Sequence, residues 1–199
     1  MYNQYAALIF DMDGTLIESG KLHEHAWTHA LSEFDIPVDR PLMQSLAGVP
    51  TLQTIEIVIE KFGINVDYPL EHILQAKERW VAKNNIDYVK ATKLADIVRE
   101  YHGKKPMAVG TGANAEEAEQ MLEACGIRSY FECVITSDHV KEFKPSPETF
   151  LLCASKLNVE PTQCIVFEDS PLGIEAAVRA GMAAVNVQTE LDIINDYFR

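Results

Sequence analysis

The chain contains five short runs of apolar residues, one near its start and four in its second half. Their residues do not alternate between apolar and polar, which is typical of strands buried on both faces of a parallel sheet. The sequence predicts strands at residues 5–10, 106–111, 131–137, 164–169 and 183–187. Between the later runs, apolar residues recur at helical spacing and predict helices at 115–125, 147–157 and 171–180. Alternating strands and helices predict a doubly wound, mostly parallel, Rossmann-like α/β fold.

The last two of these helices begin with the same dipeptide, Ser146-Pro147 and Ser170-Pro171. Serine suits the N-cap of a helix and proline its first position, so we expect each serine to cap its helix.

Residues 18–85 contain no strand-like run. Their apolar positions predict only helices, at 22–34, 51–62 and 70–83. We therefore expect an α/β core domain made of residues 1–17 and 86–199, with residues 18–85 inserted as a small helical cap after the first strand. Ligands of open α/β sheets bind at the carboxyl ends of the strands, where such an insert is well placed to act as a lid.

The composition and charge of the chain limit the kinds of partner that it could bind. The 199 residues carry a formal net charge of −13 and no run of Lys and Arg, which argues against nucleic-acid binding. No apolar stretch approaches the length of a membrane span, and the first strand begins by Tyr5, which leaves no room for a signal peptide. We expect a cytoplasmic monomer. The four cysteines show no CxxC spacing, so neither a disulfide framework nor a zinc site is expected.

Chemically competent side chains gather at the ends of the predicted strands. Asp11 and Asp13 directly follow the strand at residues 5–10. Burying two carboxylates this close together costs several kcal/mol of folding free energy unless a positive charge or a shared proton compensates them. Acids, a hydroxyl and an amine are expected at one rim of the sheet, at the ends of three strands and in one loop. They are Asp11 and Asp13, Thr111 and Gly112, Glu168 and Asp169, and Lys144 in the loop before residues 147–157.

This set favours phosphoryl transfer through a covalent carboxyl phosphate. A carboxylate can attack phosphorus, but the approach of two anions requires neutralising charge. Oxygen ligands from Asp11, from the carbonyl of Asp13 and from Asp169 suit Mg²⁺. Lys144 supplies a second positive charge, and Thr111 can hold phosphoryl oxygens. Asp13 then remains as the general acid for the leaving oxygen and as the base for the attacking water.

The motifs DMDGT, VGTG, KP and EDS occur in the order found in the haloacid dehalogenase-like hydrolase superfamily, which the whole chain resembles. The helical insert resembles the cap of its β-phosphoglucomutase-like branch. The resemblance implies that Asp11 is the nucleophile, Asp13 the acid/base, and Thr111, Gly112 and Lys144 phosphate ligands. It also implies that Asp11, Asp13 and Asp169 hold Mg²⁺, and that Glu168 supports the metal or binds it.

One residue of the predicted cap is a further candidate. His23 aligns with a histidine that the β-phosphoglucomutase-like branch holds near the site. A place on a polar helix face explains it equally well.

Further stretches, such as PTQCIVFEDS, resemble sugar-phosphate phosphatases of that branch. The resemblance implies an Mg²⁺-dependent phosphatase, with fructose 1-phosphate as the first candidate substrate and 6-phosphogluconate as the second. The alternative is a phosphohexomutase of the β-phosphoglucomutase type. Ala47 and Thr51 stand where that mutase pattern has basic residues, which argues against it. Asp13 argues against a dehalogenase. A phospho-aspartate signalling receiver would be shorter and would lack the helical insert.

Overall fold

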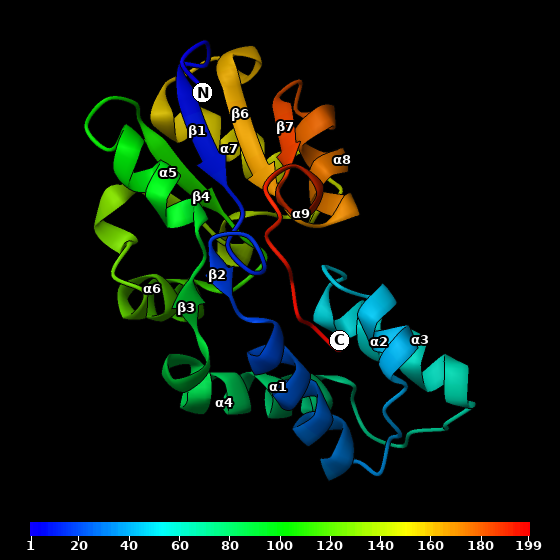
Figure 1. The fold of residues 1–199 in the computed structure, drawn as a ribbon. Helices are drawn as coiled ribbons and strands as arrows, with labels where there is room; N and C mark the ends of the chain where they lie inside the picture. The colour runs from blue at the N-terminus through cyan, green and yellow to red at the C-terminus, as the bar shows by residue number, and fades with distance from the viewer.

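The computed structural model describes residues 1–199, and a five-stranded parallel sheet forms its centre (Figure 1). The strand order is β5-β4-β1-β6-β7. The five expected strands and the doubly wound α/β fold are confirmed. The strands are β1 (Ala7–Phe10), β4 (Met107–Gly110), β5 (Cys133–Ile135), β6 (Cys164–Glu168) and β7 (Ala183–Asn186).

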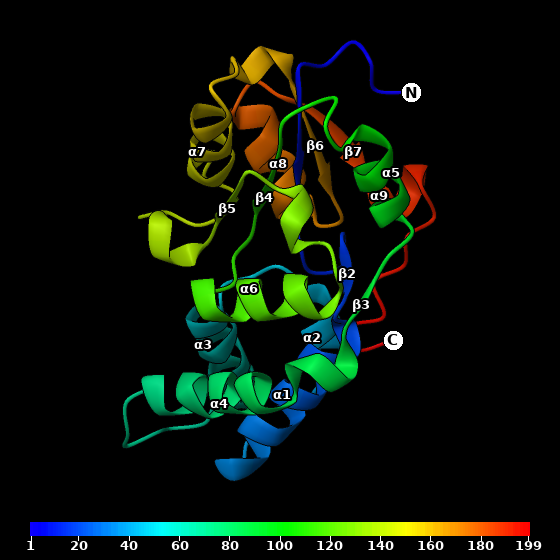
Figure 2. The ribbon, with the colours of Figure 1, turned by 90° about the vertical axis from the view of Figure 1, so that its left-hand side faces the viewer.

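Helices cover both faces of the sheet (Figure 2). One face packs against α5 (Leu94–Tyr101) and α6 (Ala115–Ala124), and the other against α7 (Glu148–Leu157) and α8 (Pro171–Arg179). Successive side chains of β1 divide between these layers, Leu8 and Phe10 on the first face and Ala7 and Ile9 on the second. All four are fully buried, which is why the strand has no polar alternation.

The remaining helices form a separate group beyond the carboxyl ends of β1 and β6, towards which the arrows of these strands point in Figure 1. The group comprises α1 (Gly20–Glu33), α2 (Arg40–Ser45), α3 (Thr51–Phe62) and α4 (Glu71–Tyr88). It has its own hydrophobic cluster, which includes Trp27, Met43 and Ile55. Two residues of the C-terminal tail, Tyr197 and Phe198, belong to the same cluster.

Several elements were not expected from the sequence. They are α2, α5, the final helix α9 (Val187–Glu190) and the antiparallel pair of β2 (Ile17–Glu18) with β3 (Lys90–Ala91). Helix α7 begins at Glu148, directly after Pro147, so the expectation that Ser146 is its N-cap is wrong by one residue. Ser170 does cap α8, because its hydroxyl accepts a hydrogen bond from the N–H of Gly173 at 3.1 Å.

All four cysteines are free, as expected. No helix in the structure combines the length and the apolar character needed to span a membrane.

Candidate active site

The register of the sheet brings the polar strand ends together. Phe10, the last residue of β1, pairs with Val109 of β4 on one side and with Phe167 of β6 on the other. Asp11 therefore follows β1 between the ends of its two neighbours. The chain builds β4 and β5 on one side of β1 and then β6 and β7 on the other. Such a switch point is where open α/β sheets place their ligands.

Three buried carboxylates meet at this point. Ligand atoms of Asp11, Glu168 and Asp169 lie within 4.8 Å of one another. The ammonium of Lys144 lies 2.6 Å from Oδ1 of Asp11 and 2.8 Å from Oε2 of Glu168. Lys144 offsets one of the three negative charges, and a divalent cation would offset the other two. The donor set is all oxygen, which is the set that Mg²⁺ prefers.

The pKa values of these groups reflect their burial first and the excess of negative charge second. Burial raises the pKa of Asp11 well above its ordinary range, repulsion from Glu168 adds to this, and Lys144 opposes it. Burial and Glu168 likewise raise the pKa of Asp169 to about 7. Burial alone would lower the pKa of Lys144, but its two carboxylate partners raise it. A bound divalent cation would favour the charged form of both aspartates and so oppose these shifts.

Glu168 is the most completely hydrogen-bonded of the three acids. Its Oε1 accepts from the backbone N–H groups of Asp169 and Ser170, at 3.0 and 2.9 Å, and from the Ser170 hydroxyl at 3.0 Å. Its Oε2 is held by Lys144. Both oxygens are thus engaged by the protein, and this favours a supporting role for Glu168 over direct metal binding.

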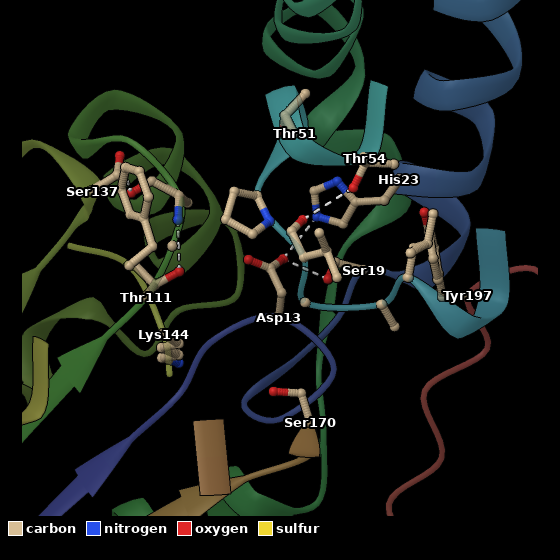
Figure 3. Close-up of a pocket in the computed structure, with 18 of the residues that line it drawn as sticks. Asp13, Ser19, His23, Thr51, Thr54, Thr111, Ser137, Lys144, Ser170 and Tyr197 are labelled. Atoms are coloured by element: carbon tan, nitrogen blue, oxygen red, sulfur yellow. Dashed lines mark hydrogen bonds and ion pairs between the residues drawn. The ribbon is translucent and has the colours of Figure 1, made fainter. Parts of the chain in front are cut away.

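Asp13 lies apart from the acidic cluster and faces the helices (Figure 3). Its Oδ1 accepts from the Ser19 hydroxyl at 2.6 Å and lies 3.0 Å from Nε2 of His23 on α1. Burial alone would raise the pKa of Asp13, but the charge and hydrogen bond of His23, together with Ser19, lower it. Of the two interpretations of His23, the structure favours a place at the site.

Thr111 and Gly112 follow β4 directly and line the same cavity. Thr111 is buried, and its hydroxyl accepts a hydrogen bond from the N–H of Ala113 at 3.1 Å, which shapes a tight turn. Figure 3 shows Thr111 and Lys144 on one side of Asp13, with His23 and Thr54 above it. Lys141, which lies close to Lys144 in the sequence, is exposed and does not line the cavity.

The cavity has a volume of about 380 Å³ and opens between the strand ends and the helices. Ala47, Thr51 and Trp27 line its helical wall, although Trp27 is 4% exposed and belongs mainly to the hydrophobic cluster of the helices. Lys77 also lines it, with its ammonium 5.7 Å from the centre of the Trp27 ring. Sequence reasoning missed Lys77. The available signal was its spacing, four residues after Ile73 and therefore on the apolar face of α4.

The fold and the site together define a hydrolase of the haloacid dehalogenase type. The family model described as haloacid dehalogenase-like hydrolase matches residues 8–187, and the chain belongs to this family. This result also excludes the interpretation as a signalling receiver.

Individual relatives point to phosphorylated substrates. The chain is 44% identical over 190 residues to the fructose-1-phosphate phosphatase YqaB of Escherichia coli, covering 94% of this chain and 99% of the relative. It is 28% identical to the β-phosphoglucomutase of Bacillus subtilis, covering 91% of this chain and 82% of that protein. The crystal structure of CbbY from Rhodobacter sphaeroides in complex with phosphate has a TM-score of 0.77 and 26% identity, covering 90% and 84% of the two chains. With this family and these relatives, the protein is a phosphoric monoester hydrolase.

Proposed function

We propose that this enzyme is an Mg²⁺-dependent phosphatase that hydrolyses a small sugar phosphate through an aspartyl phosphate on Asp11. One observation carries the proposal. Asp11 sits at the switch point of the sheet with a lysine ammonium 2.6 Å from one of its oxygens, inside a cluster of acids that lacks two positive charges. A phosphoryl group arriving at such a site would meet a nucleophile, a fixed cation and a place for a metal ion.

In the first step, a carboxylate oxygen of Asp11 attacks phosphorus and the bond from phosphorus to the ester oxygen breaks. Lys144 binds Oδ1, while Oδ2 accepts no hydrogen bond from the protein, so Oδ2 is the candidate nucleophile. The leaving oxygen takes a proton from the carboxyl group of Asp13. His23 and Ser19 orient that carboxyl group through their contacts with Oδ1.

In the second step, the Asp13 carboxylate accepts a proton from water as the water oxygen attacks phosphorus. The bond between phosphorus and Asp11 breaks, inorganic phosphate leaves, and both aspartates return to their starting states. The lowered pKa of Asp13 favours the carboxylate form that this step requires and disfavours the protonated form that the first step requires. Thr111 and the backbone after β4 would bind phosphoryl oxygens, and their position in the cavity lining supports this role.

The carboxylates of Asp11 and Asp169 and the carbonyl of Asp13 would hold the Mg²⁺ ion, with Glu168 supporting them. When bound, Mg²⁺ supplies positive charge that offsets the acids and the phosphoryl oxygens.

Helices α1, α3 and α4 form one wall of the cavity and so limit the size of the substrate. We propose that residues 18–85 form a cap and that residues 1–17 and 86–199 form the catalytic core of a monomer. The two crossings between these parts pair as β2 and β3, with Ile17 opposite Ala91, and this ribbon is the candidate hinge. A cavity of about 380 Å³ accommodates a hexose phosphate. Fructose 1-phosphate is the first candidate because of the relative at 44% identity, and 6-phosphogluconate is the second.

A phosphohexomutase is the second candidate function, and Lys77 is the observation that favours it. A mutase must hold and reorient a phosphorylated intermediate, and Lys77 provides a cation on the helical wall of the cavity. Against this, Ala47 and Thr51 line the cavity without charge. The two functions differ in their products, which are free phosphate and an isomerised sugar phosphate.

The decisive experiment is a panel of hexose 1-phosphates, hexose 6-phosphates, 6-phosphogluconate and nucleoside monophosphates, tested with Mg²⁺ for both phosphate release and product identity. We expect fructose 1-phosphate to be hydrolysed fastest, EDTA to abolish the rate, Mg²⁺ to restore it and Ca²⁺ to fail. Asp11→Asn is the matched control and should retain less than about a tenth of the rate, since losing the nucleophile removes several kcal/mol of barrier lowering. A nucleotide as best substrate, or glucose 6-phosphate formed from β-glucose 1-phosphate, would overturn the assignment.

A further inference from the structure

The C-terminal tail, residues 191–199, reaches back into the active site. Figure 1 shows it leaving α9 and running from the sheet down to α1 and α2. The family model matches residues 8–187, so the tail lies outside the matched segment. Two of its residues, Asn195 and Tyr197, line the cavity.

Asn195 contacts a proposed metal ligand directly. Its amide Nδ2 donates to Oδ2 of Asp169 at 2.9 Å, and its Oδ1 accepts from the N–H of Tyr197 at 3.0 Å. Both ends of the amide group are therefore engaged, which fixes its orientation. Gln188 also donates to Oδ2 of Asp169, at the longer distance of 3.4 Å. Oδ1 of Asp169 receives only the Thr15 hydroxyl, at 3.4 Å, and so has the greater capacity left for a cation.

The tail is firmly anchored on the helices. Tyr197 and Phe198 are 8% and 4% exposed and pack in the hydrophobic cluster of α1–α4. The guanidinium of Arg40 donates to the carbonyl of Arg199 at 3.0 Å and lies 5.4 Å from the centre of the Phe198 ring. This anchoring fixes the backbone next to Asn195, so that less conformational entropy is lost when its amide binds Asp169.

The loop after β1 is shaped to receive the same contact. Gly14 has a φ of +76°, and a Cβ atom placed there would overlap both Nδ2 of Asn195 and Oδ2 of Asp169. A glycine at this position lets the loop that carries Asp11 and Asp13 lie directly against the pair. Three segments distant in sequence thus converge on one oxygen of Asp169.

We propose that Asn195 is a positioning residue for the divalent-cation site. By holding Oδ2 of Asp169, it turns the other carboxylate oxygen towards the position that the cation would occupy. Groups that orient metal-binding carboxylates typically contribute 10- to 100-fold in metal affinity. The inference rests on the proposed metal dependence of the enzyme and adds a residue that lies outside the family motifs.

The test measures cation binding directly in the full chain, with Mn²⁺ as the probe and its free concentration followed by electron paramagnetic resonance. Asn195→Ala should bind Mn²⁺ roughly 10-fold more weakly than the wild type. The Mg²⁺ concentration that gives half-maximal activity should rise in parallel, while kcat at saturating Mg²⁺ and KM for the phosphate ester stay nearly constant. Ile194→Ala is the matched control, because Ile194 is the neighbouring tail residue and is 60% exposed. It should bind Mn²⁺ as the wild type does.

The outcomes separate the two proposals. If the wild type does not bind Mn²⁺ at millimolar concentration, the proposed metal dependence fails. If the wild type binds and Asn195→Ala differs from it by less than about threefold, below the range typical of such groups, the positioning role fails. Circular dichroism melting of each variant shows whether the fold is retained. A weakened Mn²⁺ affinity in a variant that melts at the wild-type temperature supports the proposal.

Discussion

Nε2 of His23 lies 3.0 Å from Oδ1 of Asp13, and this contact joins the first helix after β1 to the proposed general acid. His23 helps to lower the pKa of Asp13, so His23→Ala should raise it. In the proposed mechanism Asp13 acts as a base when the aspartyl phosphate is hydrolysed, and a higher pKa of Asp13 shifts formation of the carboxylate to higher pH. The acidic limb of kcat at saturating Mg²⁺ should therefore move to higher pH.

The control for this prediction is His25→Ala, because His25 is exposed on the same helix. Its pH profile should follow that of the wild type. An acidic limb that stays in place in His23→Ala would separate His23 from the acid/base function.

Asp13→Asn tests the proton transfer to the leaving group. General acid catalysis contributes roughly 10²- to 10⁴-fold, but an activated aryl phosphate has a leaving group that needs little protonation. The variant should therefore lose much more activity on fructose 1-phosphate than on p-nitrophenyl phosphate. The measurement is kcat/KM for both substrates in both proteins, because kcat/KM reports the steps up to departure of the leaving group and leaves out the later hydrolysis step that both substrates share. Equal losses on the two substrates would contradict the acid role.

As a proposed metal ligand with a raised pKa, Asp169 should link metal binding to the stability of the fold. Its pKa is raised from 3.8 to about 7, so the folded state binds a proton that the unfolded state has released between these values. This contribution to the free energy of unfolding is complete below pH 3.8 and is lost as pH rises to about 7. A single such group contributes at most ~1.4 kcal/mol per pH unit across that window.

Asp169→Asn removes the buried charge. In metal-free buffer at pH 8 the variant should therefore be more stable than the wild type, and near pH 4 the difference should vanish. Mg²⁺ should stabilise the wild type at pH 8 and leave the variant nearly unchanged. Urea unfolding at the two pH values, with EDTA or Mg²⁺, measures this. A variant less stable than the wild type at pH 8 without metal would show that the carboxylate does not destabilise the fold.

The central sheet could be predicted from the sequence because each strand is a short apolar run. The residues that directly follow parallel strands must lie together at the carboxyl ends of those strands. The same reasoning therefore predicts that Asp11, Thr111 and Asp169 lie close together. The pairing of β2 with β3 could not be found in this way. Strands of two residues carry no periodicity, and their partners are more than seventy positions apart in the chain.

The positions of Lys77 and Asn195 in the site could not be predicted from the sequence either. Each reaches the cavity because an element far from the motifs folds back over the strand ends, and a local pattern does not encode that path. Lys77 is recognisable as a charge on an apolar helix face, whereas Asn195 lies between the apolar residues Ile194 and Tyr197-Phe198, in a segment with no motif or periodicity that indicates a site. Ser146 shows that even a good capping dipeptide fixes a helix start only to within a residue.

The close approach of Gly173 to Glu168 carries the last prediction. Gly173 lies in the first turn of α8, and a Cβ atom there would overlap the carboxylate of Glu168. That carboxylate cannot easily move, because Ser170 and two backbone N–H groups hold one oxygen and Lys144 holds the other. Gly173→Ala should displace Glu168 and loosen Lys144 from its position beside Asp11. Overpacking of this kind costs about 1–3 kcal/mol, and phosphatase activity should fall with it.

A second substitution separates this clash from a simple helix effect. Alanine is favoured over glycine inside a helix by roughly 1 kcal/mol, so without the clash Gly173→Ala would be neutral or stabilising. In a Glu168→Ala background the overlapping atoms are absent, and there Gly173→Ala should stabilise the protein. The measurement is urea unfolding of the wild type, both single variants and the double variant. If Gly173→Ala lowers stability equally in both backgrounds, the cost comes from elsewhere in α8, and Glu168 does not depend on the absent side chain.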